Sequence, residues 1–465
     1  YSADESWSTV DRCRWGVGAN NEHQTRGHEG GADWLPPETD VSIRPGWFYH
    51  ASEDDRVKSL DKLLDIYYHS VGLNSVLLLN VPPDRRGLLH ENDVARLAEF
   101  RAVIDATFAT DLAKGKPASA SAVRGGDPLY GAANVTCDDQ DTYWATDDGV
   151  TSASVEVDLG GPTTFNVVAL GEPIMLGQRV RRFHVEARID GAWQPLAEGR
   201  TIGYLRLLRL APVTASAVRV TIDDARACPC LNTVGLFLEP AKVEFNTDDR
   251  AFDAGAGMDL TLTATVPGAQ VRYTLDGSEP TGDSPLATGV LRLTDTTTVR
   301  ARAWYEGLPS PYAAEAVFEA LVAQPATLGE PAADFACTYY EGGWQTLDQM
   351  ADAVPVAESR QASVSLEPVG REQHCALRFE GSFVAPVDGL YRFWLTSDDG
   401  SRLWLDGRLV VDNDGLHGEP RERCGLANLR AGNHALTVSW FCAAGGQSLA
   451  VAWAGPDGVR VPLCS

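Results

Sequence analysis

The fold at the start of the chain is decided by residues 33–50, DWLPPETDVSIRPGWFYH, and by residues 63–100, LLDIYYHSVGLNSVLLLNVPPDRRGLLHENDVARLAEF. Within them, residues 40–50 form an extended run that predicts a strand, and apolar residues then recur at helical spacing up to Tyr68. Residues 75–81, SVLLLNV, form a continuous apolar run, which is typical of a buried parallel strand. The sequence therefore predicts a strand, a helix and a second strand, in that order.

A second helix is expected to begin near residue 90, at HENDV, after the loop VPPDRRG. One face of this helix is predicted to be apolar and to carry Val94, Leu97, Phe100 and Ile104. Two strand-and-helix repeats of this kind are typical of an α/β barrel or of a doubly wound sheet. Because a closed barrel of this class needs eight repeats, two of them cannot close one.

The composition excludes several classes of protein. The 465 residues are 44% hydrophobic and 22% charged, which is enough apolar material for a core and excludes disorder as the main state. The formal net charge of -25 repels phosphate backbones and anionic lipid, so nucleic acid is not an expected partner. No apolar run reaches the roughly 18 residues that span a bilayer, so no membrane span is expected.

From about residue 113 onwards the chain reads as short strands that alternate apolar and polar residues. Alternation is clear in ASVEVDL at residues 153–159 and in RRFHVEARI at residues 181–189. Further short strands fill residues 243–320, and from about residue 335 strands alternate with Asp-Gly turns, a strong hairpin signal. The sequence thus predicts three all-β modules behind the α/β segment.

The nine cysteines do not indicate a metal site. They include no CxxC pair, and Cys228-Pro-Cys230 is too tight for a metal knuckle. Five of the nine fall in the last part of the chain, at Cys337, Cys375, Cys424, Cys442 and Cys464. One or two disulfides there would suit an extracellular module, but the residues alone leave bridged and free thiols equally open.

The segment quoted first resembles the C-terminal end of the catalytic barrel of retaining α-L-fucosidases of glycoside hydrolase family 29, and among them the subgroup that prefers α-1,3/1,4-linked fucose. The apolar strand, the NVPPDRRG loop and the helix start match together in order, over roughly residues 1–105. The resemblance implies that residues 1–108 are the incomplete C-terminal end of a (β/α)8 barrel. It also implies a secreted or cell-surface enzyme whose partners are fucosylated oligosaccharides or glycoproteins.

The same resemblance places both catalytic carboxylates outside this stretch. Retaining glycosidases use a nucleophile and an acid/base about 5 to 5.5 Å apart. In the family, the aspartate nucleophile lies on an earlier strand and the glutamate precedes a segment like ESWSTVD, which is residues 5–11 here. We therefore expect both carboxylates upstream of Tyr1 and expect this chain alone to be inactive. Glu38 and Asp40 are not expected to substitute, because a bare strand start offers no pocket to desolvate them.

Substrate contacts are implied for three residues around the barrel strand. Trp47 is expected to stack on the apolar, methyl-bearing side of fucose, and Glu38 and His50 are expected to contact the sugar. Each has a packing alternative: Trp47 as a core residue of the barrel rim, Glu38 as a residue that orients a loop, and His50 as hydrogen-bonded packing at the strand end. No cofactor is expected for catalysis.

Residues 109–240 resemble the discoidin domain, also called the coagulation factor 5/8 type C domain, a β-sandwich common as a sugar-binding module on secreted glycosidases. The run DTYWATDDGVTSASVEVDLGG at residues 141–161 carries much of the resemblance. Tyr143 and Tyr204 are the candidate residues for stacking on sugar, whereas Trp144 is expected in the core. The alternative is that this sandwich only packs against the barrel.

Members of that domain family often hold a structural calcium ion at an Asp-rich turn, through carboxylate and carbonyl oxygens. Here the turn reads CDDQDTYW and lacks the usual glycine. The aspartates of this turn, Asp138, Asp139 and Asp141, are the candidate calcium ligands, whereas the missing glycine favours the alternative, a plain solvated acidic turn.

Residues 241–322 are similar to the chitobiase/β-hexosaminidase C-terminal module, an immunoglobulin-like sandwich, which implies a spacer. Residues 330–465 resemble the lectin-like β-barrel domain first named from anthrax protective antigen, through GLYRFWLTSDDGSRLWLDGRLVVDNDG at residues 389–415. Members that act as adhesins bind sugar through calcium held by paired aspartates. The resemblance implies this role for Asp398 and Asp399, with a plain hairpin turn as the alternative.

The expected architecture is multidomain: a C-terminal remnant of a (β/α)8 barrel followed by three all-β modules, which are a discoidin-like sandwich, an immunoglobulin-like sandwich and a lectin-like β-barrel. Two functions compete. The chain is either a fragment of a secreted retaining exo-α-L-fucosidase with appended carbohydrate-binding modules, or a set of non-catalytic carbohydrate-binding and spacer modules that act as a glycan adhesin. The sequence does not indicate an oligomeric state.

Overall fold

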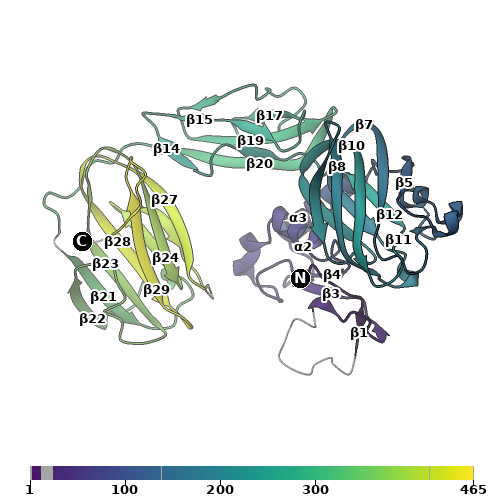
Figure 1. Ribbon diagram of the computed structural model, residues 1–465. Coiled ribbons are helices and arrows are strands. Elements are labelled where there is room, and N and C mark those ends of the chain that lie inside the picture. The colour runs from purple at the N-terminus through teal and green to yellow at the C-terminus, as the bar shows by residue number, and fades with distance from the viewer. Residues whose placement is uncertain (1–2, 12–24, 138, 333, 418, 464–465) are drawn as a thin grey trace. The chain divides into compact units, whose positions relative to one another are not determined.

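The computed structural model describes the chain except at residues 1–2, 12–24, 138, 333, 418 and 464–465 (Figure 1). Packing divides the chain into two compact units. The first comprises Tyr1–Val243, Ala264–Gln270 and Arg302–Ala313, and the second comprises Glu244–Thr263, Val271–Ala301 and Ala314–Ser465. The domain boundaries expected from the sequence, after residues 108, 240 and 322, stay predictions.

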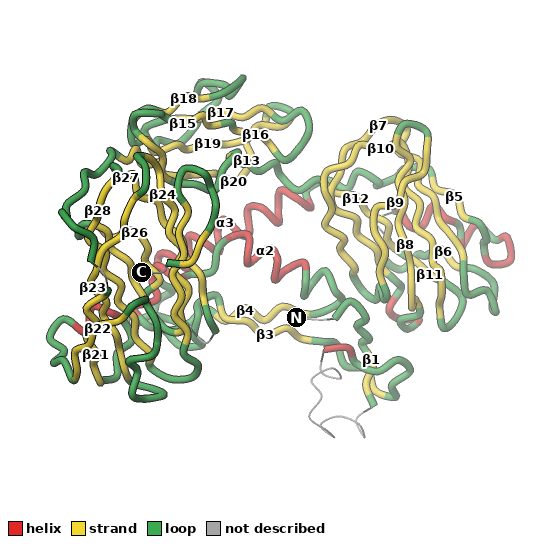
Figure 2. The backbone as a smooth tube through the Cα atoms, turned by 60° about the vertical axis from the view of Figure 1, so that its left-hand side comes forward, coloured by secondary structure: helices red, strands yellow, loops and turns green. Residues whose placement is uncertain are grey.

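The first unit contains a parallel pair of strands with two helices. Strand β3 (Glu38–Ser42) pairs in parallel with β4 (Val76–Asn80), and helix α2 (Leu60–Tyr68) connects them. Helix α3 (Glu91–Phe108) follows β4. The predicted order of strand, helix, strand and helix is confirmed, and among the described residues these strands form a two-stranded sheet, with no closed barrel (Figure 2). Two short strands, β1 (Thr9–Val10) and β2 (Asp33–Trp34), pair ahead of β3.

Two details of this segment differ from the sequence prediction. The strand predicted over residues 40–50 ends at Ser42, because the Ser42 hydroxyl donates to the carbonyl oxygen of Gly46 at 2.7 Å and closes a turn around Pro45, which has no N–H for a ladder. On α3, Val94 is 49% exposed, whereas Leu97 packs against the core below the strands. The apolar face of α3 therefore begins about one turn later than its periodicity predicts.

The buried guanidinium of Arg44 ties this segment together. Its Nε donates to both carboxylate oxygens of Asp93, at 3.1 and 2.9 Å, and its Nη1 donates to Asp54 at 2.9 Å. The side chains of Arg44 and Asp93 are fully buried. Burial by itself lowers the pKa of Arg44, but the hydrogen bonds to Asp93 and Asp54 outweigh it and leave that pKa raised. The pair joins the turn after β3 to the first turn of α3.

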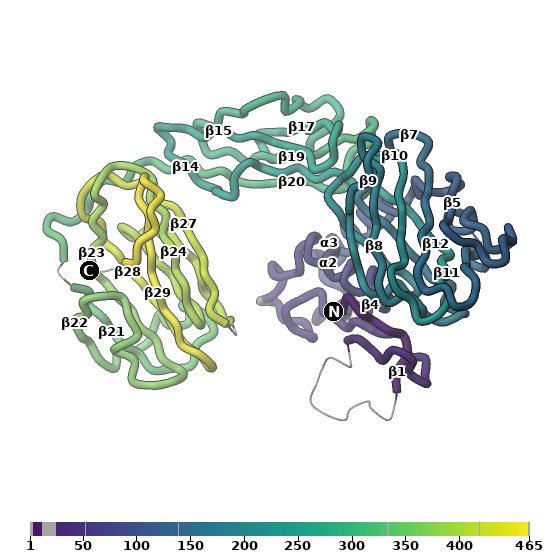
Figure 3. Tube along the Cα trace, viewed as in Figure 1, coloured from purple at the N-terminus to yellow at the C-terminus, as the bar shows by residue number. Residues whose placement is uncertain are grey.

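A six-stranded antiparallel sheet follows α3 in the chain, in the order β12-β7-β10-β8-β9, with β5 against β7 (Figure 3). Its strands are β5 (Ala118–Ala120), β7 (Ala153–Gly171), β8 (Val180–Ile189), β9 (Ala192–Gly199), β10 (Arg206–Ala225) and β12 (Thr233–Phe237). A short pair, β6 (Trp144–Ala145) and β11 (Cys230–Leu231), completes this part. Trp144, Phe165 and Phe183 are fully buried in its core.

Residues 243–321 form short strands and two long ones. The strands are β13 (Val243–Phe245), β14 (Ala251–Asp253), β15 (Met258–Leu260), β16 (Leu262–Ala264), β17 (Gln270–Thr274), β18 (Leu291–Leu293), β19 (Thr297–Tyr305) and β20 (Leu308–Leu321). They build a four-stranded sheet in the order β14-β20-β19-β17, together with the pairs β13-β16 and β15-β18. The all-β prediction for this stretch is confirmed.

The last part of the second unit consists of two sheets. One has the order β22-β21-β23-β28-β25-β26 and the other has the order β27-β24-β29-β30. The strands are β21 (Phe335–Glu341), β22 (Ala357–Gln361), β23 (Cys375–Ala385), β24 (Gly389–Asp398), β25 (Ser401–Leu405), β26 (Arg408–Asn413), β27 (Arg421–Leu429), β28 (Gly432–Cys442), β29 (Ser448–Ala454) and β30 (Val461–Pro462). Phe379, Tyr391, Phe393 and Trp440 are fully buried in its core.

The cysteine question left open by the sequence is answered for the described residues, whose seven cysteines are all free thiols. Cys375 and Cys442 lie opposite each other on β23 and β28 without a bond between them. Cys13 and Cys464 lie outside the described residues. Within the same limits, no helix has both the length and the apolar character that a membrane crossing requires.

A second buried charge, Glu172, follows β7 directly. Its Oε1 accepts the backbone N–H groups of Arg179 and Val180, at 2.6 and 3.0 Å, and its Oε2 accepts that of Gly203 at 2.7 Å. Burial raises the pKa of Glu172 to about 7, and the three N–H donors act in the opposite direction. The carboxyl group therefore joins the loop that precedes β8 to the loop around Gly203.

Glu172 should make the first unit less stable as pH rises from about 4.5 to 7. The folded pKa of about 7 lies above the ordinary value of 4.5, so the folded state binds the extra proton in this window and rising pH removes it. We expect Glu172→Gln to abolish about 3 kcal/mol of this pH dependence. Chemical denaturation of both proteins at several pH values measures it, with Glu99→Gln as the exposed control. If the free energy of unfolding falls with pH equally in the wild type and in Glu172→Gln, the pH dependence does not come from Glu172.

Asp93→Ala should destabilise the first unit by about 3 to 5 kcal/mol, because it leaves the buried Arg44 guanidinium without its main partner. Glu99→Ala is the matched control on the same helix. It removes an ion pair with Arg96 whose carboxylate side is half exposed, and it should cost no more than about 1 kcal/mol. Urea denaturation followed by tryptophan fluorescence compares the two variants, and a similar small loss for both would refute the role of Arg44.

Candidate functional site

The turn after β3, residues 43–50, lies at the carboxyl edge of the parallel strands and is held from two sides. Asn80, the last residue of β4, donates from Nδ2 to the carbonyl oxygen of Trp47 at 2.9 Å and to the Ser42 hydroxyl at 3.1 Å. Lys58 donates from Nζ to the carbonyl oxygens of Ser42 and Arg44, at 2.7 and 3.0 Å. Burial lowers the pKa of Lys58. These bonds fix the backbone of the turn.

The fixed turn presents aromatic side chains to solvent. Trp47 is 51% exposed and Phe48 is 79% exposed, so neither is a core residue of the described structure. His50 follows on the same turn, and its carbonyl oxygen accepts the N–H of Glu53 at 2.9 Å. Ligand sites of parallel α/β folds lie at the carboxyl ends of the strands. The structure therefore brings Trp47, His50 and Asn80 to the edge where such a site is expected.

Glu38 does not join this group. It is the first residue of β3, so the full length of the five-residue strand separates it from the turn that carries Trp47. At about 3.3 Å per residue, this separation along the strand is more than 10 Å. Its side chain is exposed at the amino edge of the sheet. The sugar contacts predicted for Trp47, His50 and Glu38 stay predictions.

Sequence reasoning missed Arg44 and its two carboxylate partners. Asp54 and Asp93 each stand in or near the first turn of a helix, where acidic residues are common for another reason, the helix dipole. The available signal was Arg44 itself, a charged residue directly after the apolar Ile43 at the end of a strand. A charge in that position is buried only when it is paired.

The two tyrosines predicted as sugar-stacking residues lie in different places. Tyr143 packs near Tyr130, with ring centroids 5.7 Å apart, in a pocket of about 440 Å³ that Arg124 and Arg179 also line. Tyr204 is 68% exposed and lines a separate and larger pocket. Trp144 is fully buried, and its indole N–H donates to the carbonyl oxygen of Ala122 at 2.8 Å. The expectation that Trp144 is a core residue is confirmed.

The acidic turn predicted as a calcium site is only partly described. Asp138 lies outside the described residues. Asp139 accepts the backbone N–H of Asp141 at 3.0 Å, and both side chains are exposed. Among the described residues, no group of three His, Cys, Asp or Glu side chains is placed to hold a metal ion. Calcium binding at this turn stays a prediction.

Asp398 and Asp399 stand at the end of β24 and are both buried. The Oδ1 of Asp399 accepts the N–H of His417 at 3.0 Å, and its Oδ2 accepts that of Ala443 at 2.9 Å. Asp398 differs, because its Oδ1 is buried without a hydrogen-bond partner. Burial and the neighbouring Asp399 raise the pKa of Asp398. As at the acidic turn, no group of three His, Cys, Asp or Glu side chains is placed here among the described residues to hold a metal ion, so calcium binding by Asp398 and Asp399 stays a prediction.

Comparison with known families divides the chain into four stretches. Residues 2–105 match the α-L-fucosidase family, and residues 117–233 match the F5/8 type C domain. Residues 253–314 match the chitobiase/β-hexosaminidase C-terminal domain, and residues 363–465 match the PA14 domain.

Two curated plant proteins are similar to part of the chain. A protein of Oryza sativa subsp. japonica, provisionally named α-L-fucosidase 1, is 42% identical over 246 residues, which are 52% of this chain and 47% of that protein. α-L-Fucosidase 1 of Arabidopsis thaliana is 38% identical over 238 residues, 50% of this chain and 47% of that protein. The chain thus spans about half the length of the curated relatives that it matches.

Among solved structures, a Ruminococcus gnavus fucosidase of glycoside hydrolase family 29, crystallised with fucose, is 37% identical to this chain, with a TM-score of 0.46. The match covers 51% of this chain and 48% of that one. The chain thus contains one stretch that matches the α-L-fucosidase family and three stretches that match the F5/8 type C, chitobiase/β-hexosaminidase C-terminal and PA14 domains.

Proposed function

We propose that the chain is part of a secreted, retaining exo-α-L-fucosidase that releases terminal α-1,3/1,4-linked fucose. The family match of residues 2–105 supports the fucosidase assignment. The observation that carries the proposal is the aromatic turn at the carboxyl edge of β3 and β4, where Trp47 is exposed on a backbone fixed by Asn80 and Lys58. We infer that the enzyme acts outside the cell on fucosylated oligosaccharides or glycoproteins.

In this proposal the turn binds sugar and the remainder of the enzyme breaks the bond. Fucose has a methyl group and an apolar ring face, and the Trp47 indole offers a flat surface of about 50% exposure for both. Asn80 and Lys58 keep that surface in place between substrates, so little ordering is needed on binding. Retention needs a carboxylate nucleophile and a carboxyl acid/base, which we assign to sequence outside these 465 residues.

Glycan binding by the β modules is a second candidate function. The buried Oδ1 of Asp398, which has no partner among the described residues, favours it in the PA14 stretch. A calcium ion held by Asp398 and Asp399 would supply a Lewis-acidic contact for sugar hydroxyl groups. In that case the chain is a set of carbohydrate-binding and spacer modules, whether or not it is attached to a catalytic half.

The fucosidase proposal is tested with an aryl α-L-fucoside. We expect no turnover above buffer from the 465-residue chain and clear turnover from a protein that continues upstream into a complete catalytic domain. The configuration of the first product, followed by NMR, reads out retention directly. Turnover by the short chain, or an inverted product from the long protein, would overturn the corresponding part of the proposal.

In the longer protein, Trp47→Ala should lower kcat/KM for the aryl fucoside by about 10 to 100-fold, which corresponds to about 1 to 3 kcal/mol of lost stacking and burial. Trp34→Ala is the matched control, because Trp34 is 64% exposed and lies outside the turn. Steady-state kinetics and thermal melting of both variants separate a lost sugar contact from a lost fold. Equal kinetics for the two variants would remove Trp47 from the site.

A further inference from the structure

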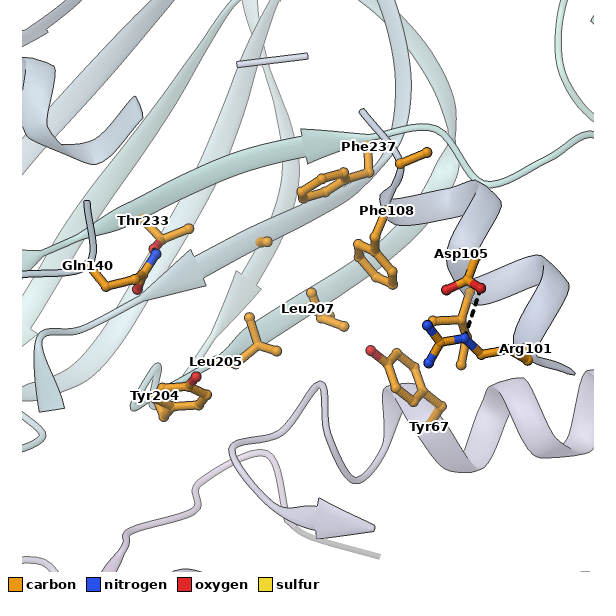
Figure 4. Close-up of a pocket in the computed structure, with 13 residues that line it drawn as sticks. Tyr67, Arg101, Asp105, Phe108, Gln140, Tyr204, Leu205, Leu207, Thr233 and Phe237 are labelled. Atoms are coloured by element: carbon orange, nitrogen blue, oxygen red, sulfur yellow. Dashed lines mark hydrogen bonds and ion pairs between the residues drawn. The ribbon is translucent and has the colours of Figure 1, made fainter. Parts of the chain in front are cut away.

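A pocket of about 750 Å³ lies in the first unit between the helices and the six-stranded sheet (Figure 4). Its volume is in the range of small-molecule sites. The floor is the outer face of the sheet, where Leu207 of β10 stands opposite Ala169 of β7, and Phe237 of β12 continues the surface. Phe108 at the end of α3 packs edge-on against Phe237, with ring centroids 5.0 Å apart. The floor is therefore apolar and firmly packed.

Two tyrosines border this floor from opposite sides. In Figure 4, Tyr67 of α2 and Tyr204 of the loop before β10 lie on either side of Leu205 and Leu207. Tyr67 is half-buried and its ring contacts those of Phe100 and Phe108, at 6.2 Å in each case, whereas Tyr204 is 68% exposed. Neither phenol hydroxyl hydrogen-bonds another described residue. Both rings and both hydroxyl groups remain available to a ligand.

Polar side chains form the rest of the pocket rim. Arg101 donates from Nε to Asp105 at 2.8 Å, and this exposed ion pair borders the pocket on the side of α3. Gln140 and Thr233 border it at the other end, 3.4 Å apart between Nε2 and Oγ1. The one positive and one negative charge of the rim cancel, so the pocket offers hydrogen bonds without a net charge to select an ion.

The chain topology places this pocket away from the aromatic turn at the carboxyl edge. Helix α2 runs back to the amino edge, and the turn that leads from it into β4 is bonded to the start of β10. The N–H of Leu207 donates to the carbonyl oxygen of Gly72 at 2.9 Å, and the N–H of Asn74 donates to that of Leu205 at 3.0 Å. The pocket floor thus adjoins the amino end of β4, and Trp47 stands beyond its carboxyl end.

We propose that this pocket is a non-catalytic binding site for a neutral pyranose unit of a glycan. A pyranose ring has an apolar C–H face, which suits the leucine floor and the tyrosine rings, and a rim of hydroxyl groups, which suits the amide, guanidinium and carboxylate groups around it. An anion would be repelled as much as attracted by the Arg101–Asp105 pair. A purely apolar ligand would exclude water from the two phenol hydroxyl groups without giving them hydrogen-bond partners. This site goes beyond the proposed hydrolysis and does not depend on it.

The test uses the 465-residue chain carrying Trp47→Ala, so that neither turnover nor sugar binding at the aromatic turn contributes to the signal. The probes are the methyl glycosides of L-fucose, D-galactose and N-acetyl-D-glucosamine, and a sialylated glycoside as the charged comparison. Saturation-transfer NMR and calorimetric titration should give a Kd of about 1 mM for at least one neutral probe. Tyr204→Ala should weaken it at least about 10-fold, and Tyr67→Phe, which removes only a hydroxyl, by a smaller factor.

Met175→Ala is the matched control, because Met175 is 89% exposed and does not line the pocket, and it should leave the affinity unchanged. Because Tyr204 is exposed, its variant should melt at the wild-type temperature, which keeps loss of binding distinct from loss of fold. The proposal is overturned if no neutral probe binds up to about 20 mM, or if binding survives both Tyr67→Phe and Tyr204→Ala. Loss of binding in Met175→Ala, or tighter binding of the sialylated probe, would also overturn it.

Discussion

The first unit depends on one buried carboxylate, that of Glu239. It accepts two hydrogen bonds from the Arg209 guanidinium on β10, one from the hydroxyl of Tyr68 at the end of α2, and one from the hydroxyl of Tyr312 on β20, at 2.5 to 3.2 Å. Burial and the Glu239 carboxylate raise the pKa of both tyrosines, so they stay neutral donors. Three segments far apart in the sequence meet at this charge, and loss of the carboxylate would leave two buried phenols and the partly exposed Arg209 guanidinium without this acceptor.

This constraint also sets the geometry of both sites. The hydrogen bond from the Tyr68 hydroxyl to Glu239 fixes the end of α2. The neighbouring Tyr67 therefore has a fixed position against the sheet and forms one wall of the pocket. The same anchored helix packs Leu63 and Ile66 under the strands, in the cluster that includes Val41 of β3 and Leu79 of β4. The strands whose carboxyl edge carries Trp47 therefore pack on helix α2, and the end of this helix is hydrogen-bonded to Glu239. A fixed scaffold lowers the ordering cost of sugar binding at either place.

The sequence predicted what local pattern can encode. The order of strands and helices over residues 38–108 and the all-β character of the rest follow from periodicity and turn residues. The long-range polar pairs could not be predicted, because Arg44 and Asp93 are 49 positions apart and Tyr68 and Glu239 are 171 positions apart. Each of these residues alone looks like an ordinary surface charge or a half-buried ring. The pocket escaped prediction for the same reason, since its walls come from the helices and its floor from the sandwich.

The placement of the two proposed sugar sites limits which glycans can occupy both. The pocket adjoins the amino end of β4 and the aromatic turn follows the carboxyl end, so at least the five residues of that strand, about 16 Å, separate them. A single sugar ring cannot reach across that distance, whereas a branched or polymeric glycan can place one terminal unit at the turn and an internal unit in the pocket. Two weak contacts on one polymer raise the effective concentration of the second unit to about the millimolar range. Under the two proposals, tight binding depends on the branching of the glycan, because a monosaccharide at the turn has only one contact to break before it leaves.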